Sequence, residues 1–216
     1  MLNGEIQRDL VLVGGGHSHV LALRMLAMQA LPGVRITLIS LDTHSPYSGM
    51  LPGLVAGHYS HADTHIDLRR LCAWAGARFI RAEVTGLDLD RKRLMFAGAR
   101  PDLDWDVLSL DTGSQPDTAI VAGVEGVTPV KPIASFQQRW RDWSGQLHAG
   151  HTSRLAVVGG GVGSVEIALA ARYWLARHRA DSTVAITLIS AGAGLLPPRL
   201  VPRVFAVTPV ATSDVD

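Results

Sequence analysis

Hydrophobic and polar positions follow one pattern twice along this chain: a short aliphatic run, a cluster of glycines, and a longer segment with apolar residues at helical spacing. In its first occurrence, residues 10–13 are all Leu or Val, glycines fill 14–16, and apolar side chains recur through 18–31 at intervals typical of a helix. A short branched run bounded by glycine predicts a strand that is buried on both faces of a sheet. A further apolar run at 34–40 completes a predicted β-α-β unit.

The second occurrence has the same order, with an aliphatic run at 155–158, glycines at 159–161, a helical pattern and a further strand. The second strands of the two units even end identically, because residues 36–40 and 186–190 both read Ile-Thr-Leu-Ile-Ser. Two such units, each with a glycine turn at the same junction, are much less expected by chance than one. We therefore predict an α/β fold with two Rossmann-like dinucleotide-binding units.

The residues between the two units give weaker signals. Residues 43–59 are rich in Gly, Pro, Ser and His and predict a loop or short helical turn at the ligand-facing edge of the sheet, with a purely structural surface loop as the alternative. A helix is predicted at 66–74, an alternating strand at 79–90 and an apolar strand at 107–114. A boundary between the two units is expected at 146–151.

The glycine turns carry the candidate chemistry. Gly14 and Gly16 allow a tight turn and let backbone N–H groups approach a pyrophosphate, while the helix N-terminus adds a partial positive charge. The third glycine of such a motif would fall at position 19, where this chain has His19. One imperfect motif is weak evidence, and an ordinary strand-to-helix turn is the alternative interpretation. The corresponding residues of the second turn are Gly159, Gly161 and Ser164.

Composition narrows the class of protein. With 216 residues, 47% of them hydrophobic, and a net charge of +1, the chain predicts a globular protein with no general attraction to nucleic acid or anionic lipid. No apolar run reaches the ~18 residues of a membrane span, and the N-terminus lacks the pattern of a signal peptide. We therefore expect no membrane span and a cytoplasmic location.

The number of cysteines and the spacing of the histidines argue against a dithiol mechanism and a metal site. Cys72 is the only cysteine, which excludes a dithiol mechanism within this chain and favours a small buried hydrophobic residue. His58, His61 and His65 have a spacing that invites a metal interpretation, but no cysteine pattern accompanies them. We expect these histidines to be exposed or capping residues and predict no metal site.

The features that carry a family resemblance are, in chain order, the first glycine turn, the segment at 46–59, the Thr112-Gly113 pair and the second glycine turn. In these features the chain resembles the FAD/NAD(P)-binding pyridine nucleotide-disulfide oxidoreductase family. Within it the chain is similar to type II NADH dehydrogenases and sulfide:quinone reductases. Residues 46–59 look most like the flavin domain that is fused to selenide, water dikinase in some bacteria. The resemblance covers residues 8–198.

The resemblance implies roles for individual residues. The first turn would hold the FAD pyrophosphate, the end of the second strand the adenosine ribose, and the second turn the NAD(P) pyrophosphate. Glu166 would lie near the flavin–nicotinamide junction, although an exposed helix carboxylate is the alternative. The implied FAD positions are Gly14, Gly16, His17, Ser18, Ser40, Asp42, Pro52, Val84, Thr112, Gly113 and Lys131, and the implied NAD(P) positions are Gly159, Gly161, Val162, Ser164 and Glu166.

The chain departs from the family at several points. Asp111 stands where the family usually has alanine before Thr-Gly, and Ser190 stands where it usually has a glutamate that binds the NAD ribose. The family also continues beyond the length of this chain. The expected domains are an FAD-binding segment at 1–148, a partial NAD(P)-binding segment at 149–198 and a disordered or aberrant tail at 199–216.

The resemblance implies an FAD-dependent oxidoreductase that passes hydride from NAD(P)H to the flavin and electrons on to an acceptor such as a quinone. The resemblance also suggests fusion or association with a selenide, water dikinase, and a homodimer. Two alternatives stay open at this point. One is a truncated, catalytically incompetent nucleotide-binding module, and the other, less favoured, is an NAD(P) reductase without flavin.

Overall fold

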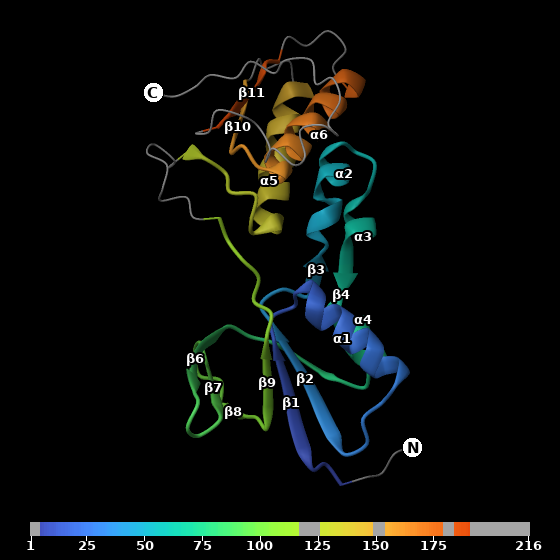
Figure 1. Ribbon diagram of the computed structural model, residues 1–216, viewed down its shortest axis with the longest axis vertical. Helices are drawn as coiled ribbons and strands as arrows, with labels where there is room; N and C mark the ends of the chain where they lie inside the picture. The colour runs from blue at the N-terminus through green and yellow to red at the C-terminus, as the bar shows by residue number, and fades with distance from the viewer. Residues whose placement is uncertain (1–4, 117–125, 149–153, 179–183, 191–216) are drawn as a thin grey trace. The chain divides into compact units, whose positions relative to one another are not determined.

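A computed structural model of the chain describes residues 5–116, 126–148, 154–178 and 184–190 (Figure 1). The chain divides into two compact units. The first unit comprises residues 1–47 and 65–115, and the second comprises 48–64 and 116–216. The predicted tail at 199–216 and the second half of the predicted boundary at 146–151 lie outside the described residues.

The first unit is built on a parallel sheet of four strands in the order β5-β2-β1-β9. The strands are β1 (Arg8–Val13), β2 (Val34–Ser40), β5 (Arg78–Arg81) and β9 (Val107–Leu110). Leu12 pairs in register with Leu38 of β2 on one side and with Ser109 of β9 on the other. The chain order therefore reverses on either side of β1, which places a topological switch point at the C-terminal end of that strand.

Both faces of β1 are buried, as the aliphatic run predicts. Leu12 belongs to a core cluster that includes Val20 and Leu23 of α1 (His17–Met28) and Cys72 of α4 (Leu68–Trp74). Val11 and Val13 instead belong to the cluster on the other face, which includes Leu94 and Phe96. Successive side chains of a strand point to opposite faces, so an unbroken apolar run is what two covered faces require.

The second covering layer is a three-stranded antiparallel sheet of β6 (Val84–Asp88), β7 (Arg93–Phe96) and β8 (Leu103–Asp104). The predicted single strand at 79–90 is therefore wrong in part. Its first residues form β5 of the parallel sheet and its last residues form β6 of the antiparallel one. Two short segments, β3 (His44–Pro46) and β4 (His65–Asp67), pair antiparallel at the base of the predicted loop.

Helix α4 begins two residues later than the predicted start of its helix. The Asp67 side chain accepts hydrogen bonds from the backbone N–H groups of Arg69 (2.9 Å) and Arg70 (3.3 Å). A carboxylate that satisfies the free N–H groups of a first turn is a common N-terminal cap, and it defines where this helix begins.

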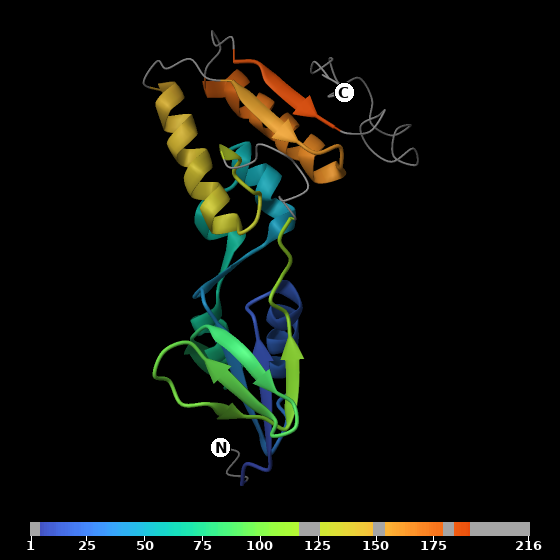
Figure 2. The same ribbon diagram turned by 90° about the vertical axis from the view of Figure 1, so that its left-hand side faces the viewer.

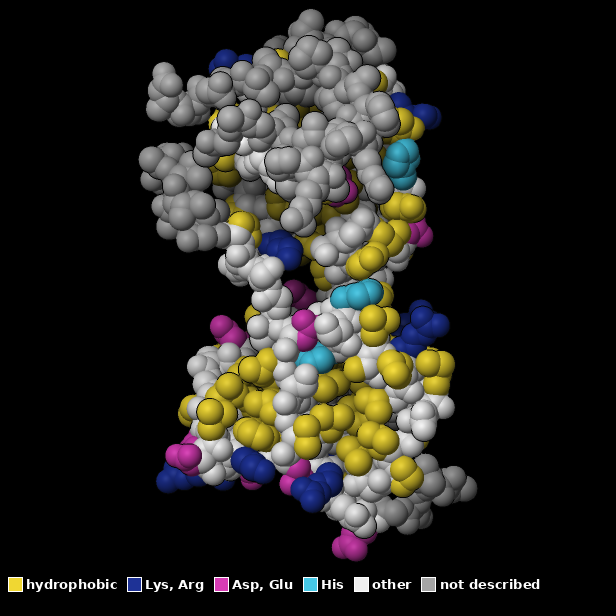
Figure 3. Space-filling model, in the orientation of Figure 1, with side chains coloured by type: hydrophobic (Ala, Val, Ile, Leu, Met, Phe, Trp, Pro, Cys, Tyr) yellow, Lys and Arg dark blue, Asp and Glu magenta, His cyan; other side chains and the backbone are white. Residues whose placement is uncertain are grey.

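Helix α1 buries only part of its apolar face. Val20 and Leu23 are buried, whereas Met25 and Met28 are about two-thirds exposed, at 65% and 64%. Figure 3 shows hydrophobic side chains exposed over the first unit. The helical spacing of apolar residues in 18–31 thus predicts the helix correctly but overstates how many of its side chains are buried.

The second unit contains the repeated β-α-β pattern. Strands β10 (Leu155–Val158) and β11 (Ile186–Ile189) are parallel, and α6 (Val162–His178) packs on them (Figure 2). Its core also holds side chains from α5 (Ile133–His148) and from α2 (Leu51–Val55), with Ala171 and Trp174 of α6 among the buried residues. The remaining short elements are a 3₁₀ turn at Ser48–Met50 and α3 (His61–Thr64).

The chain thus has the predicted α/β fold with parallel sheets typical of Rossmann-like FAD/NAD(P)-binding domains. Residues 43–59 include β3, the 3₁₀ turn and the five-residue α2, so the predicted short helical turn is present, and only β3 was not expected. Among the described helices, none is both long and apolar enough to cross a membrane.

Candidate functional site

The first glycine turn lies at the switch point of the parallel sheet. The Gly14 N–H donates to the carbonyl of Ile39 at the end of β2, at 2.8 Å. On the other side, the Asp111 N–H donates to the carbonyl of Val13, also at 2.8 Å, so β9 stays paired beyond its last assigned residue. The turn is therefore held between two neighbouring strand ends, which is where open α/β sheets bind their ligands.

This turn needs glycine because the end of β9 closes on it. Gly14 has a positive φ of 99°, and a Cβ there would collide with the backbone carbonyl of Asp111. At Gly16, a Cβ would collide with the side-chain carboxylate of Asp111. The second glycine of a dinucleotide motif normally leaves room for the pyrophosphate. In this chain, a carboxylate of the protein occupies the space beside it.

His19 stands at the position of the third glycine and belongs to the core. It is 3% exposed, its Nδ1 lies 2.7 Å from the Gly14 carbonyl oxygen, and its Nε2 lies 2.9 Å from Ser109 Oγ. A neutral ring that carries its proton on Nδ1 donates to the carbonyl and accepts from the serine hydroxyl. The buried His19 ring thus bridges the glycine turn to β9.

The N-terminus of α1 already has an anionic partner. The backbone N–H groups of Ser18 and His19 both donate to Asp111 Oδ2, at 3.0 and 3.2 Å. The predicted site residues did not include Asp111, although its departure from the family's alanine was a usable signal. Its negative charge is stabilised by the partial positive charge of the helix end.

The other predicted residues of the first turn lie around this helix end. His17 and Ser18 are exposed, and the His17 ring stacks on Tyr47 with 4.6 Å between ring centroids and 23° between planes. Tyr47 follows β3, so the stacking ties the predicted ligand-side segment to the start of α1.

Four further predicted FAD residues lie at or next to the same edge of the sheet. Ser40 ends β2, and its Oγ lies beside Gly15, while Asp42 is exposed two residues later. Thr112 and Gly113 follow Asp111 directly, and the Thr112 backbone approaches Gly14. The carboxyl ends of β1, β2 and β9 thus bring together residues that are more than 70 positions apart in sequence.

Val84 lies elsewhere in the first unit. It begins β6 and pairs with Phe96 in the antiparallel sheet. Pro52 lies in α2 and Lys131 just before α5, both within the second unit. The predicted FAD contacts of these three residues stay predictions.

The second glycine turn repeats the geometry of the first. The Gly159 N–H donates to the carbonyl of Ile189 at 2.8 Å, which is the same bond that Gly14 makes to Ile39. Gly159 also has a positive φ, of 128°, and a Cβ there would crowd Ser164 Oγ at 2.6 Å. The repeat predicted from sequence is therefore present at the level of individual hydrogen bonds.

The N-terminus of α6 differs from that of α1 in its surroundings. Val162 begins the helix, and a Cβ at Gly161 would have no described heavy atom within 4 Å. Within the described part of the chain, no carboxylate caps this helix end as Asp111 caps α1. Glu166 is exposed on α6, which agrees with the alternative of an exposed helix carboxylate. Its place near the nicotinamide stays a prediction.

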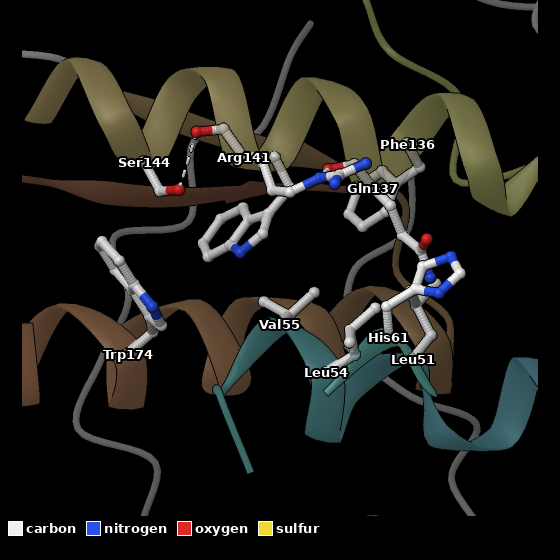
Figure 4. A pocket seen from close by; sticks show the side chains of 10 residues that line it. Leu51, Leu54, Val55, His61, Phe136, Gln137, Arg141, Ser144 and Trp174 are labelled. Atoms are coloured by element: carbon white, nitrogen blue, oxygen red, sulfur yellow. Dashed lines mark hydrogen bonds between the residues drawn. The ribbon is translucent and has the colours of Figure 1, made fainter. Parts of the chain in front are cut away.

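An apolar hollow of the second unit lies away from the glycine turns (Figure 4). It has a volume of about 240 Å³ and a mostly apolar lining with a few polar side chains, among them Arg141 and the buried Gln137. None of the predicted cofactor residues lines it. It is a space between α2, α5 and α6, and we assign no ligand to it.

The three histidines considered for a metal serve other contacts or lie apart. The His58 ring packs on Tyr173, with 4.7 Å between centroids. His61 belongs to the second unit and His65 to the first. Across the described residues, no group of three His, Cys, Asp or Glu side chains is arranged to hold a metal ion.

Comparison with known proteins places the chain in a family. Residues 8–207 match the family described as pyridine nucleotide-disulphide oxidoreductase, which is nearly the whole chain. The chain belongs to this family. Its members are flavin-dependent oxidoreductases of pyridine nucleotides. No curated protein matches the chain.

Solved structures of the family share the fold at low sequence identity. The sulfide:quinone oxidoreductase of Aquifex aeolicus is 21% identical, with a TM-score of 0.66 over 86% of this chain and 43% of that one. NDH2 of Plasmodium falciparum is 18% identical, with a TM-score of 0.70 over 87% and 42%. CoADR-RHD of Bacillus anthracis is 18% identical, with a TM-score of 0.73 over 90% and 34%. The chain therefore spans less than half the length of these relatives.

Proposed function

We propose that this chain binds FAD at its first glycine turn and NAD(P)H at its second, and that it belongs to an enzyme that passes hydride from nicotinamide to flavin. The observation that carries the proposal is the repeated turn. Gly14 and Gly159 make the same 2.8 Å hydrogen bond to equivalent residues of two parallel β-α-β units. A pair of such units in a fixed order matches a protein that handles two dinucleotides.

The residues of the first turn fit the adenosine diphosphate half of FAD in part. In the described part of the chain, the backbone N–H groups of Gly15, Gly16 and His17 donate to no other residue and are available to a phosphate. The exposed carboxylate of Asp42 lies two residues beyond the end of β2, where such folds bind a ribose hydroxyl. The Asp111 carboxylate does not fit an additional anion at the same helix end.

In this proposal the flavin supplies the redox chemistry by accepting hydride and releasing electrons, and the protein supplies binding and orientation. Gly14 and Gly16 hold the turn, Ser40 and Asp42 hold the ribose, and Gly159, Gly161 and Ser164 hold the nicotinamide cofactor. A quinone is the proposed acceptor because one structural relative is named a sulfide:quinone oxidoreductase.

Flavin retention tests the proposal. The full chain is incubated with FAD, desalted and examined for flavin absorbance, and NADH is then added without oxygen to observe bleaching of that absorbance. We expect retained flavin that NADH bleaches. Retained flavin without bleaching would instead support a nucleotide-binding module without turnover, and a desalted chain free of flavin would refute FAD binding.

A pair of glycine variants assigns retained flavin to the turn. Gly14→Ala and Gly98→Ala both put a side chain at a positive φ, of 99° and 77°, so their backbone strain is similar. Only the first side chain would collide with a neighbouring strand, because no atom of the described residues lies within 4 Å of a Cβ at Gly98. We expect loss of flavin from Gly14→Ala and normal retention by Gly98→Ala.

A further inference from the structure

Asp111 is the only described carboxylate at the anion-binding end of either predicted cofactor turn. Its Oδ2 accepts from two N–H groups of the first turn of α1, and its carboxylate fills the space beside Gly16. Both features are those that a bound phosphate oxygen would have at a dinucleotide turn. The side chain therefore stands in for part of the ligand.

We propose that Asp111 is an affinity-setting residue of the first turn: its carboxylate competes with the diphosphate of the cofactor for the N-terminus of α1. This inference rests on the proposed binding of FAD to that turn. Two physical effects act in the same direction. The carboxylate takes two of the donors at the helix end, and its charge repels a diphosphate bound to the remaining donors at Gly15, Gly16 and His17.

The position of Asp111 is fixed by its neighbours. Its backbone N–H bonds to Val13, and its carbonyl lies against Gly14, so the side chain cannot leave the turn by a shift of the strand alone. Asp111 is half-buried and the adjoining Ser18 is exposed. A diphosphate can therefore reach the helix end from solvent, and the carboxylate must rotate away or tolerate the new charge.

The charged and titratable groups around this carboxylate are few. From α1, the His19 ring is hydrogen-bonded to Gly14 and Ser109, and the exposed His17 ring stacks on Tyr47. From the segment after β2, Asp42 is the first acidic residue beyond the end of the strand, and it is exposed. No lysine or arginine is hydrogen-bonded or ion-paired to Asp111 among the described residues, so its charge is offset by the helix end alone.

Asp111→Asn is the informative substitution. Asparagine keeps an oxygen that accepts from the Ser18 N–H and is a good helix cap, so the fold is retained while the charge is removed. Asp106→Asn is the matched control. Asp106 lies before the other end of β9, where its Oδ2 accepts from the Asp9 N–H at 2.7 Å, so this change alters net charge equally at the opposite edge of the sheet.

Isothermal titration calorimetry of the full chain with ADP, adenosine and FAD tests the proposal. We expect Asp111→Asn to bind ADP and FAD about tenfold more tightly than the unmodified chain. Adenosine, which has no phosphate, should bind both proteins within twofold, and Asp106→Asn should bind all three ligands like the unmodified chain. Asp111→Ala, which also removes the cap, provides a second variant with the same expected direction for ADP.

Other outcomes overturn the proposal in distinguishable ways. Equal or weaker ADP binding by Asp111→Asn would show that the carboxylate does not compete, while FAD retention by the unmodified chain would leave the proposed function intact. Tighter ADP binding by Asp111→Asn without FAD binding by either protein would support the inference and refute the proposed function. A failure of every folded variant to bind ADP or FAD would refute both.

Discussion

Replacing His19 by glycine restores the third glycine of the dinucleotide motif, and it gives opposite expectations from sequence and from structure. The motif predicts a better turn, since a glycine there lets helix and strand pack closely. The structure predicts a less stable protein, because the His19 ring is 3% exposed and contacts both Gly14 and Ser109.

The expected loss can be estimated from these contacts. Each of the two ring hydrogen bonds contributes about 1 kcal/mol, and a glycine within a helix costs about 1 kcal/mol relative to alanine. The space left by the ring adds about another 1 kcal/mol if the surroundings relax in part. His19→Gly should therefore lower the free energy of unfolding by about 3–4 kcal/mol, a large share of the ~5–15 kcal/mol of an ordinary domain.

Urea denaturation followed by circular dichroism measures this loss, and hydrogen exchange of the peptide that spans β1 and α1 locates it. Ser164→Gly is the matched control, because Ser164 holds the equivalent position of the second turn and is less deeply buried. It should lose less than about 1 kcal/mol, because that cost of a helical glycine is relative to alanine and serine is already a weaker helix former. His19→Asn, which keeps a donor near the place of Nδ1, should lose less than His19→Gly. A His19→Gly protein as stable as the unmodified chain would falsify the assigned role of the ring.

Two further predictions concern residues away from the site. The Asp9 carboxylate accepts hydrogen bonds from the Arg35 side chain at 2.6 and 2.7 Å. These bonds are the main reason that the pKa of Asp9 lies below the ordinary 3.8. The stability that this pair contributes is present above pH ~4 and is lost as the pH falls through the lowered pKa of Asp9. Asp9→Asn should therefore lower the free energy of unfolding by about 1 kcal/mol at pH 7. It should also weaken the dependence of the free energy of unfolding on pH at acid pH. Burial raises the pKa of the Cys72 thiol to about 11. A thiol reagent at pH 8 should therefore modify the urea-unfolded chain rapidly and the native chain very slowly. Fast labelling of the native chain would contradict the buried position of Cys72.

Sequence periodicity was sufficient for the two β-α-β units because their information is local. The aliphatic runs, the glycines and the helical spacing all lie within about 30 residues of one another. The residues at 79–90 show where this ends. Their alternation continues unchanged, yet the chain leaves the parallel sheet after Arg81 and enters the antiparallel one at Val84. Sheet membership depends on partners distant in sequence, which alternation does not report.

Part of the candidate site could likewise be predicted from the sequence, and part of it could not. The ends of β1, β2 and β9 were expected to meet because carboxyl ends of parallel strands share one edge, and they do. The partners of α1 were not predictable from its own sequence. Asp111 reaches Ser18 across 93 positions, and Ser109 reaches His19 across 90. Only the order of strands in the sheet brings these groups together.

The two departures from the dinucleotide motif belong to one arrangement. His19 replaces a glycine and Asp111 replaces an alanine, and a position-by-position comparison counts them as separate losses. In the structure, His19 contacts two residues near the end of β9: its ring is hydrogen-bonded to Ser109, and its backbone N–H donates to the Asp111 carboxylate. A glycine at 19 would permit close packing of α1 on the sheet, whereas the ring and the carboxylate join the helix to β9 by hydrogen bonds. The effects of His19→Gly and Asp111→Asn on stability should therefore be non-additive, because each change alters the strand end that the other residue contacts.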